Sequence, residues 1–304
     1  MKILYIGVFD AVGKSTNTSQ LMAFKALGHD VVGYNYRQKA QAIGSANRDK
    51  HLCSLVRERS FDLVIFSKCN LLPLSVFEEI SELTTTCLWF MDPLSTLRKH
   101  PEIYRAAKVV DYFCFDKKNI APEIEESNKN CFHVCEGYDE TIEQPQKTEK
   151  EYDVSFIGNI YGNRKEKLSQ VNYPVKVINN AFGPAHSVEV SKTRINLNFC
   201  TDQGASDRIY KIMAAGGFLL TDEWEGRQAD FIDGKDLVIF NDADDLNAKI
   251  KYYLKNSDER AAIALGGLNK VQQFDRASWA SKIVNLSYEI QKNLSIFQRY
   301  EGIR

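Results

Sequence analysis

Residues 204–223, GASDRIYKIMAAGGFLLTDE, decide the fold because they read as a loop, a helix, a glycine corner and a buried strand. Ser206 can cap a helix that we expect from about Asp207 to Ala215, since its hydroxyl can accept from a free N–H of the first turn. Two glycines then let the helix end and the chain turn closely into the apolar residues 218–220. A helix that passes directly into a buried strand is typical of an α/β fold with a parallel sheet.

Groups suited to a ligand stand at both ends of this helix–strand unit. The positive end of the helix, with Ser206 and Arg208 beside it, suits a phosphate. Asp222 and Glu223 follow the strand, at the carboxyl edge where open α/β sheets bind ligands. We therefore predict one site that joins phosphate-binding groups to carboxylates able to accept from sugar hydroxyls.

Length and composition describe a chain that is large enough for two ordinary domains. The sequence has 304 residues, of which 44% are hydrophobic and 26% charged, with a net charge of −1, as in globular proteins. This charge gives no general attraction to nucleic acid or anionic membranes. The start, MKILYIGV, indicates a first strand and not a signal peptide, and no run reaches the roughly 20 apolar residues of a membrane span. Seven cysteines, mostly in apolar stretches, favour reduced thiols and a cytoplasmic location.

Apolar strand-like runs and helical patterns alternate along the whole chain. In the first half we expect strands at 2–8, 29–36, 61–67, 86–91, 109–115 and 131–135. Between them we expect helices at 17–27, 45–59, 74–83, 95–107 and 117–126. In the second half we expect strands at 153–157, 175–178, 195–199, 217–221 and 236–240, and closing helices at 244–255, 257–273 and 276–298. Strands this apolar are buried on both faces of a parallel sheet that has helices on each side.

A polar stretch separates the two alternations. Residues 139–151, DETIEQPQKTEKE, contain a proline and lack an apolar period, so we interpret them as an interdomain linker. The chain then forms two Rossmann-like domains, residues 1–145 and 146–304, which face each other across a cleft.

The loop after the first strand of the second domain, GNIYGNRKEK, carries a second phosphate signal. Gly158 and Gly162 permit close backbone approach, and Arg164 and Lys165 lie in the first turn of the next helix. Cations at that position oppose the helix dipole, so a bound anion explains them better than helix stability does. A solvated surface pair is the alternative.

The first loop of the chain, GVFDAVGKST, resembles a Walker A phosphate loop but has the wrong spacing. Five residues lie between Gly7 and Gly13, whereas the motif needs four for its backbone amides to converge on one phosphate. We interpret it as a polar loop in which Asp10 and Gly13 face the cleft and Gly13 and Lys14 lie on the acceptor side. A P-loop-like phosphotransferase that uses Gly13, Lys14 and Ser15 is the alternative.

One carboxylate of the first domain is a candidate for the cleft. Asp92 follows the apolar run LWFM and precedes Pro93, which places it at the carboxyl end of a strand. A turn-forming Asp-Pro is an equal alternative.

Two patterns invite a metal interpretation that we do not adopt. Cys131, His133 and Cys135 alternate along one strand, where buried thiols are commoner than zinc ligands. Asp242 and Asp244 form an Asp-x-Asp pair, but acidic residues at this point also fit the start of a helix. We predict no metal site.

At 152–275 the order of these features resembles the GT-B glycosyltransferases, specifically the spore-maturation-protein-B-like glycosyl transferases group 1. Four stretches carry the likeness: YDVSFIGNIYGNR, HSVEVSKTRINLNF, DRIYKIMAAGGFLLTDE and FIDGKDLVIFNDADDLNAKIKYYL. The first domain is similar in architecture and at WFMDP. The resemblance implies the GT-B fold, with a last helix that crosses back to the first domain. It also implies a nucleotide sugar held mainly by the second domain, with no need for an Asp-x-Asp metal.

The resemblance further implies two groups of donor contacts. Near the diphosphate it places Gly158, Asn159, Arg164 and Arg208, and near the ribose or sugar Asp222 and Glu223. One position departs from the pattern, because Lys211 stands where many retaining GT-B enzymes have a glutamate that holds the ribose hydroxyls. Lysine cannot accept those hydrogen bonds. Either Glu223 substitutes or Lys211 adds positive charge to the phosphates, so the nucleotide and the stereochemical outcome stay open.

We therefore expect a cytoplasmic, metal-independent glycosyltransferase that needs no cofactor and moves a hexose or pentose from a UDP-sugar to an acceptor held by the first domain. The residues that we assign to catalysis are Arg208, Lys211, Asp92 and Asp10. The acceptor could be a glycan, an envelope polymer, a small molecule or a modified nucleobase in DNA, the last being disfavoured by the near-neutral charge. Besides the phosphotransferase, a non-catalytic nucleotide-sugar-binding subunit is the alternative.

Overall fold

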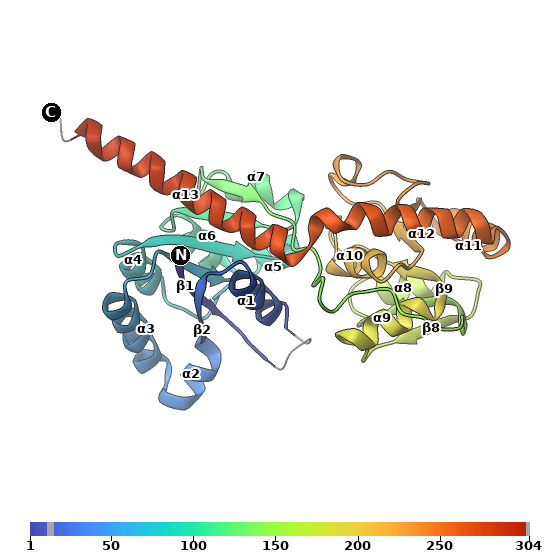
Figure 1. The fold of residues 1–304 in the computed structure, drawn as a ribbon, viewed down its shortest axis with the longest axis horizontal. Helices are drawn as coiled ribbons and strands as arrows, with labels where there is room; N and C mark the ends of the chain where they lie inside the picture. The colour runs from blue at the N-terminus through green and yellow to red at the C-terminus, as the bar shows by residue number, and fades with distance from the viewer. Residues whose placement is uncertain (11–14, 302–304) are drawn as a thin grey trace. The chain divides into compact units, whose positions relative to one another are not determined.

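The computed structural model describes residues 1–10 and 15–301, of which 294–301 as backbone only. Gly13 and Lys14 therefore lie outside the described residues. The chain is a mixed α/β protein with two sheets, and it divides into two compact units, Met1–Cys135 with Ala277–Arg304, and Glu136–Arg276 (Figure 1). Neither sheet extends across residue 145. That 1–145 and 146–304 fold as separate domains stays a prediction.

The first sheet has six parallel strands in the order β2-β1-β3-β4-β5-β6. Its strands are β1 (Lys2–Gly7), β2 (Asp30–Asn35), β3 (Leu63–Ser67), β4 (Thr85–Phe90), β5 (Tyr112–Phe115) and β6 (Cys131–His133). The sequence predicted all six. Every residue of β3 is buried, as expected for a strand with helices on both faces of its sheet.

Helices cover both faces of this sheet. They are α1 (Thr16–Ala26), α2 (Tyr36–Ile43), α3 (Ser45–Arg59), α4 (Leu74–Ser81), α5 (Leu94–Arg98), α6 (Pro101–Ala107), α7 (Ala121–Ile124) and α13 (Arg276–Glu301). Alternate side chains of each strand point to opposite faces, so one core packs against α3, α4 and α6 and the other against α1 and α13. In the second core the ring of Trp279 lies 5.1 Å from Phe24 and 5.5 Å from Trp89, centroid to centroid.

The helices of the first unit differ from the prediction at two places. The single helix expected at 95–107 is divided into α5 and α6, because Pro101 disfavours helical backbone at the residue before it. Helix α2 was not predicted. Asn35 caps it by accepting from the N–H of Gln38 at 3.1 Å.

The second sheet has five parallel strands in the order β11-β10-β9-β7-β8. Its strands are β7 (Tyr152–Ile157), β8 (Val175–Ile178), β9 (Thr193–Asn198), β10 (Leu219–Asp222) and β11 (Val238–Phe240). Its helices are α8 (Arg164–Ser169), α9 (Pro184–Ser191), α10 (Asp207–Ala214), α11 (Ala243–Lys255) and α12 (Ser257–Val271). From β7 the chain adds β8 on one side and then β9, β10 and β11 on the other. The strand order therefore reverses between β7 and β9, which is where open sheets of this kind bind ligands.

Helix α10 begins and ends as the sequence predicted. The hydroxyl of Ser206 accepts from the N–H of Arg208 at 3.2 Å, which confirms the cap. Beyond the helix, Gly216 has a φ of +72°, a conformation that glycine adopts without strain. A Cβ on Gly217 would lie 2.5 Å from Val190 Cγ1. Glycine is therefore required where α9 and α10 meet the start of β10.

None of the helices in the described part of the chain is long and apolar enough to cross a membrane.

Candidate functional site

One arginine joins the two strand ends at which the order of the second sheet reverses. Arg208, in the first turn of α10, donates from Nε to the carbonyl of Ile157 at 2.5 Å and from Nη1 to Asn198 Oδ1 at 2.9 Å. Ile157 is the last residue of β7 and Asn198 is the last residue of β9. The guanidinium is thus fixed across the carboxyl ends of neighbouring strands.

Gly158 makes room for this guanidinium. Its φ is +139°, and a Cβ built on it would lie 2.3 Å from Nη2 of Arg208. The guanidinium also lies 4.7 Å from the ring centroid of Phe156, a fully buried residue. The sequence predicted a close backbone approach at Gly158, and the group that approaches in the structure is the arginine.

A second arginine is buried in the same region. Arg164 is 2% exposed, and its guanidinium lies 4.0 Å from the ring centroid of Tyr161, a side chain that is 51% exposed. Its Nη1 donates to the carbonyl of Asn159 at 3.0 Å, and its buried Nε has no hydrogen-bond partner in the described part of the chain. The neighbouring Lys165, predicted in the same role, is exposed.

The two arginines bring two positive charges into one buried region. Burial, together with the charge of Arg164, lowers the pKa of Arg208 to about 10, so it stays charged at neutral pH. Among residues 1–10 and 15–293, no carboxylate lies within ion-pair distance of either arginine. Burying a cation is costly unless a counter-charge accompanies it. The arrangement therefore suits a bound anion.

Lys211 is occupied elsewhere on α10. Its ammonium pairs with Asp207 at 2.7 Å, one helical turn away. Burial would lower the pKa of Lys211, but Asp207 and Glu143 outweigh that effect and raise it. The structure thus engages Lys211 in an ion pair with its own helix, whereas the sequence interpretation assigned it to catalysis and gave a charge contribution to the phosphates as one of two alternatives.

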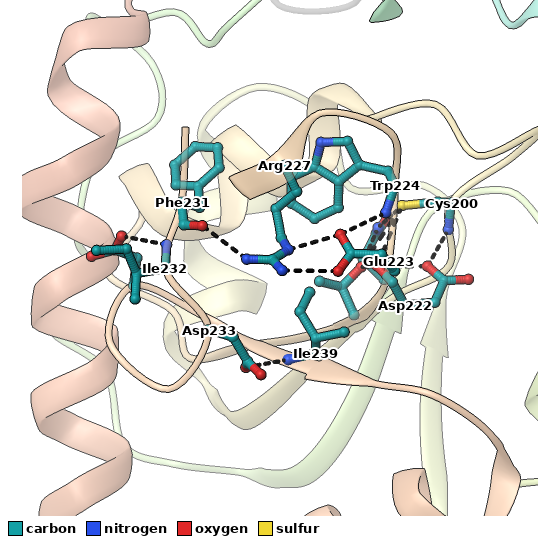
Figure 2. A network of polar contacts seen from close by, with 12 residues as sticks. Cys200, Asp222, Glu223, Trp224, Arg227, Phe231, Ile232, Asp233 and Ile239 are labelled. Atoms are coloured by element: carbon teal, nitrogen blue, oxygen red, sulfur yellow. Dashed lines mark hydrogen bonds and ion pairs between the residues drawn. The ribbon is translucent and has the colours of Figure 1, made fainter. Parts of the chain in front are cut away.

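The predicted sugar carboxylates are also tied to cations, and Figure 2 shows the pair between Glu223 and Arg227. Asp222 Oδ1 accepts from the N–H of Cys200 at 2.7 Å, and Oδ2 pairs with Lys167 of α8. Glu223 accepts a forked pair from Arg227, at 2.7 Å from Nε and 2.9 Å from Nη2, which lowers the pKa of the carboxyl. The Glu223 side chain remains 43% exposed, so its outer lone pairs face solvent.

Three residues that the sequence interpretation left out belong to this region. Asn198 holds Arg208, and Tyr161 covers Arg164. His186 of α9 is 7% exposed with Nδ1 unpartnered among the described residues, and burial and the charge of Lys211 lower its pKa to about 3. Of these three, Asn198 could have been predicted from the sequence. It ends the apolar run RINLN, and an amide at a buried strand end needs a hydrogen-bond partner.

The first unit presents a different set of groups at the carboxyl edge of its sheet. Asp92, just after β4, pairs with Lys68, just after β3. Lys68 and Cys69 have φ values of +61° and +51°, which are uncommon for residues with side chains and occur often at functional sites. Asp10 is exposed, and its carbonyl accepts from Thr18 Oγ1 at 3.2 Å.

The patterns considered for metal have other contacts. Asp242 caps α11 by accepting from the N–H of Asp245 at 2.8 Å, which confirms its predicted role. His133 Nε2 bonds with the carbonyl of Asp116 at 2.9 Å. Among the side chains that the structure describes, those of residues 1–10 and 15–293, no three His, Cys, Asp or Glu are grouped to hold a metal ion.

Comparison with known proteins gives a family and a fold. Residues 140–285 match the family described as glycosyl transferase-like. No match was found among curated proteins. HepE from Anabaena, solved with UDP-glucose, has 11% identity and a TM-score of 0.64, over 97% of this chain and 99% of its own. Sucrose-phosphate synthase from Thermosynechococcus elongatus has 11% identity and a TM-score of 0.70, over 96% and 99%. An alpha-glucosyltransferase, solved with UDP and a 13-mer DNA containing a HMU base, has 10% identity and a TM-score of 0.67, over 95% and 99%.

The similar structures extend over both units, and the family match lies mainly in the second. Identities this low establish the fold alone, and the family match covers the residues that carry the arginine site. The chain has the fold of the GT-B glycosyltransferases, and residues 140–285, most of its second unit, match the glycosyl transferase-like family.

Proposed function

We propose that this glycosyltransferase takes its sugar from a UDP-sugar whose diphosphate binds at the carboxyl ends of β7 and β9. The observation that carries the proposal is the pair of buried arginines, Arg164 and Arg208, which face only carbonyl and amide acceptors among the described residues. They stand where the strand order reverses, the position at which such sheets bind nucleotides. HepE and the alpha-glucosyltransferase were solved with UDP-glucose and UDP, which supports the choice of donor.

The chemistry follows from where negative charge develops. Transfer breaks the bond between the anomeric carbon and a diphosphate oxygen, which leaves a new negative charge on the departing UDP. Arg208 uses one donor each from Nε and Nη1 within the protein, so further donors remain on Nη1 and Nη2. A guanidinium held rigidly before the reaction stabilises that charge without reorganisation.

We propose that this arginine pair replaces a metal ion in neutralising the diphosphate. The helix N-terminus of α10, capped by Ser206, adds to the positive potential. Asp222 and Glu223 would accept from the sugar or ribose through the lone pairs that Lys167 and Arg227 leave unused. Turnover should then persist in a chelator.

For the acceptor we propose a hydroxyl compound, a glycan or small molecule, bound at the carboxyl edge of the first sheet near Asp92 and Asp10. A net charge of −1 gives no general attraction to DNA, so the DNA bound by the alpha-glucosyltransferase is a less favoured acceptor here. The described cysteines are all free, which supports a reducing, cytoplasmic compartment.

The test measures UDP binding by calorimetry and UDP release from UDP-glucose, with and without EDTA, for the wild type and two neighbouring variants. Arg164→Ala should weaken UDP binding about tenfold or more, the scale of one charge-assisted contact. Lys165→Ala, the matched control, should change it less than twofold because that side chain is exposed.

Each rival function has its own outcome in this experiment. Tight UDP binding without release of UDP on any acceptor would indicate a non-catalytic subunit. Magnesium-dependent ATP turnover with no UDP binding would indicate the phosphotransferase. Loss of all turnover in EDTA, restored by manganese or magnesium, would overturn metal independence.

A further inference from the structure

A cavity of about 370 Å³ lies at the opposite edge of the second sheet from the arginine pair. Its position follows from its lining residues, because Lys150 precedes β7, Arg194 is near the start of β9, and Phe218 precedes β10. In a parallel sheet these positions share the amino-terminal edge. The first part of α12 completes the cavity with Ser257 and Arg260.

Three cationic residues are among those that line this cavity. Lys150 donates from Nζ to the carbonyls of Ser191 at 2.7 Å and Thr193 at 2.9 Å. Arg260 donates to the carbonyl of Tyr253, and Arg194 pairs with Asp153 at 3.1 Å.

Among the residues that the structure describes, the charges of these three cations are only partly balanced. Asp153 is the carboxylate paired with one of the three, and it is 65% exposed. The acidic residues in the first turn of α12, Asp258 and Glu259, are not among the lining residues. Three positive charges and one paired carboxylate leave a local charge of about +2.

Burial and, to a smaller extent, mutual repulsion act on two of these cations. Burial, and then the charges of Arg260 and Arg194, lower the pKa of Lys150. Burial, and then Arg194, lower the pKa of Arg260. A dianion in the cavity would remove this repulsion.

The rest of the lining is apolar. It consists of Pro145, Gly216, Phe218, Ala261, Ala264, Leu265 and Leu268. Leu265 is 57% exposed, so apolar surface extends from the cavity to its rim. The volume is that of a small-molecule pocket, in which apolar walls supply area and a few polar groups fix orientation.

We propose that this cavity is a second anion site, which binds a phosphate monoester carried on a small apolar body. The phosphate faces Lys150, Arg194 and Arg260, and the apolar part packs on Phe218 and Leu265. A phosphate monoester carries a charge of about −1.5 to −2 at neutral pH and three acceptor oxygens, which matches the local charge better than a carboxylate does. The site is independent of the donor site, which lies at the carboxyl edge of the same sheet.

The test titrates phenyl phosphate into the full chain by calorimetry in the presence of saturating UDP. UDP fills the proposed donor site, so the remaining heat reports the second cavity. The same titration in Arg208→Ala keeps the two proposals separate, because that variant lacks the donor-site arginine and retains the cavity. We expect one phenyl phosphate per chain in both cases, with weaker binding of inorganic phosphate, which lacks the ring, and of benzoate, which lacks the second charge.

Three variants and a control locate the binding. Lys150→Gln and Arg260→Gln should each weaken phenyl phosphate about tenfold, the loss expected for one charge-assisted contact. Leu265→Ser should weaken phenyl phosphate and leave inorganic phosphate unchanged. Lys251→Gln, an exposed lysine of α11, should match the wild type.

Equal affinity in Lys150→Gln, Arg260→Gln and Lys251→Gln would overturn the proposal, and so would the absence of heat at millimolar phenyl phosphate in the wild type. Circular dichroism checks the fold of each variant. If a cation variant is unfolded, Leu265→Ser decides, since its exposed side chain can be changed without loss of core packing.

Discussion

The carboxyl edges of the two sheets differ in whether their cations have carboxylate partners. At the second edge, Arg164 and Arg208 are 2% and 9% exposed and donate to carbonyl or amide oxygens. At the first edge, the ammonium of Lys68 already has a carboxylate partner in Asp92. The second edge is therefore short of negative charge, and the first is balanced.

The rest of the first edge combines a second ion pair, Asp116 with Lys117 just after β5, with neutral groups. Asn17 accepts from Ser67 Oγ at 2.7 Å and from the hydroxyl of Tyr5 at 3.0 Å, and it donates to the carbonyl of Val8 at 3.1 Å. Such an edge suits a hydroxyl-bearing ligand, whereas an unbalanced one suits a diphosphate. Two sheets of the same class are thus distinguished by charge balance more than by topology, and each prediction below tests that distinction.

The largest effect should come from removing the charge at the second edge. Arg208→Ala is expected to lower kcat for donor turnover by about 10²–10³, the scale of one preorganised electrostatic donor. UDP binding should weaken less, because charge builds on the diphosphate only as the glycosidic bond breaks. Steady-state kinetics and UDP calorimetry measure the two effects. Arg208→Lys should recover part of the rate, since lysine lacks the fork. Turnover near the wild-type rate in a folded Arg208→Ala would remove this residue from the mechanism.

The next effect should come from displacing the same guanidinium without changing its charge. In Gly158→Ala the new Cβ would lie 2.3 Å from Nη2 of Arg208, and a misplacement of about 1 Å can cost roughly 10² in rate. Gly162→Ala is the matched control, because that glycine also has a positive φ, +58°, but has nothing within 4 Å of the added carbon. Kinetics should therefore separate the two variants. Equal losses in both would point to backbone strain as the cause.

The free energy of unfolding should depend on pH through His186, which lies in buried and positively charged surroundings. Burial and Lys211 lower its pKa in the folded protein to about 3, below the unfolded value of about 6.5. As the pH falls below 6.5 the unfolded chain binds the proton first, so the free energy of unfolding decreases. Between pH 7 and pH 5 the loss should be about 2 kcal/mol. Urea unfolding of the wild type and His186→Gln checks this, because the variant should lack that part of the pH dependence. Parallel pH profiles would contradict it.

The smallest effect on turnover is expected at the carboxyl edge of the first sheet. Asp92→Asn removes the charge that Lys68 pairs with and should lower turnover about tenfold, the scale of one charge-assisted hydrogen bond. UDP affinity should stay within twofold, because the proposed donor site lies at the other sheet. Turnover assays and UDP calorimetry give the two numbers. A loss of UDP affinity as large as the loss of turnover would break the assignment of separate donor and acceptor edges.

Local sequence rules predicted most of the fold and part of the site. The strands, the Ser206 cap and the Asp242 cap follow from residues close in sequence, where period and capping chemistry decide. The partners of Arg208 cannot be predicted from residues close in sequence. Ile157 is 51 positions away from it, and a backbone carbonyl leaves no mark in a sequence.

Two ion pairs could have been predicted from the sequence but were not. Asp207 and Lys211 stand four residues apart on one helix, a spacing that brings side chains together. Glu223 and Arg227 have the same separation. The pairing of Asp222 with Lys167 was not readable, because it depends on β7 and β10 both lying beside β9.

The order in which the ribosome makes this chain has a consequence for its first unit. Trp279 and Ile283 of α13 belong to the same core as Ile3 and Tyr5 of β1, yet the whole of Glu136–Arg276 is synthesised between them. One face of the first sheet therefore lacks its covering helix α13, and its aromatic side chains stay uncovered while the second unit is synthesised. Such a nascent surface invites chaperone binding or aggregation. Truncation before α13 should accordingly cost soluble yield, although every strand of both sheets would still be present.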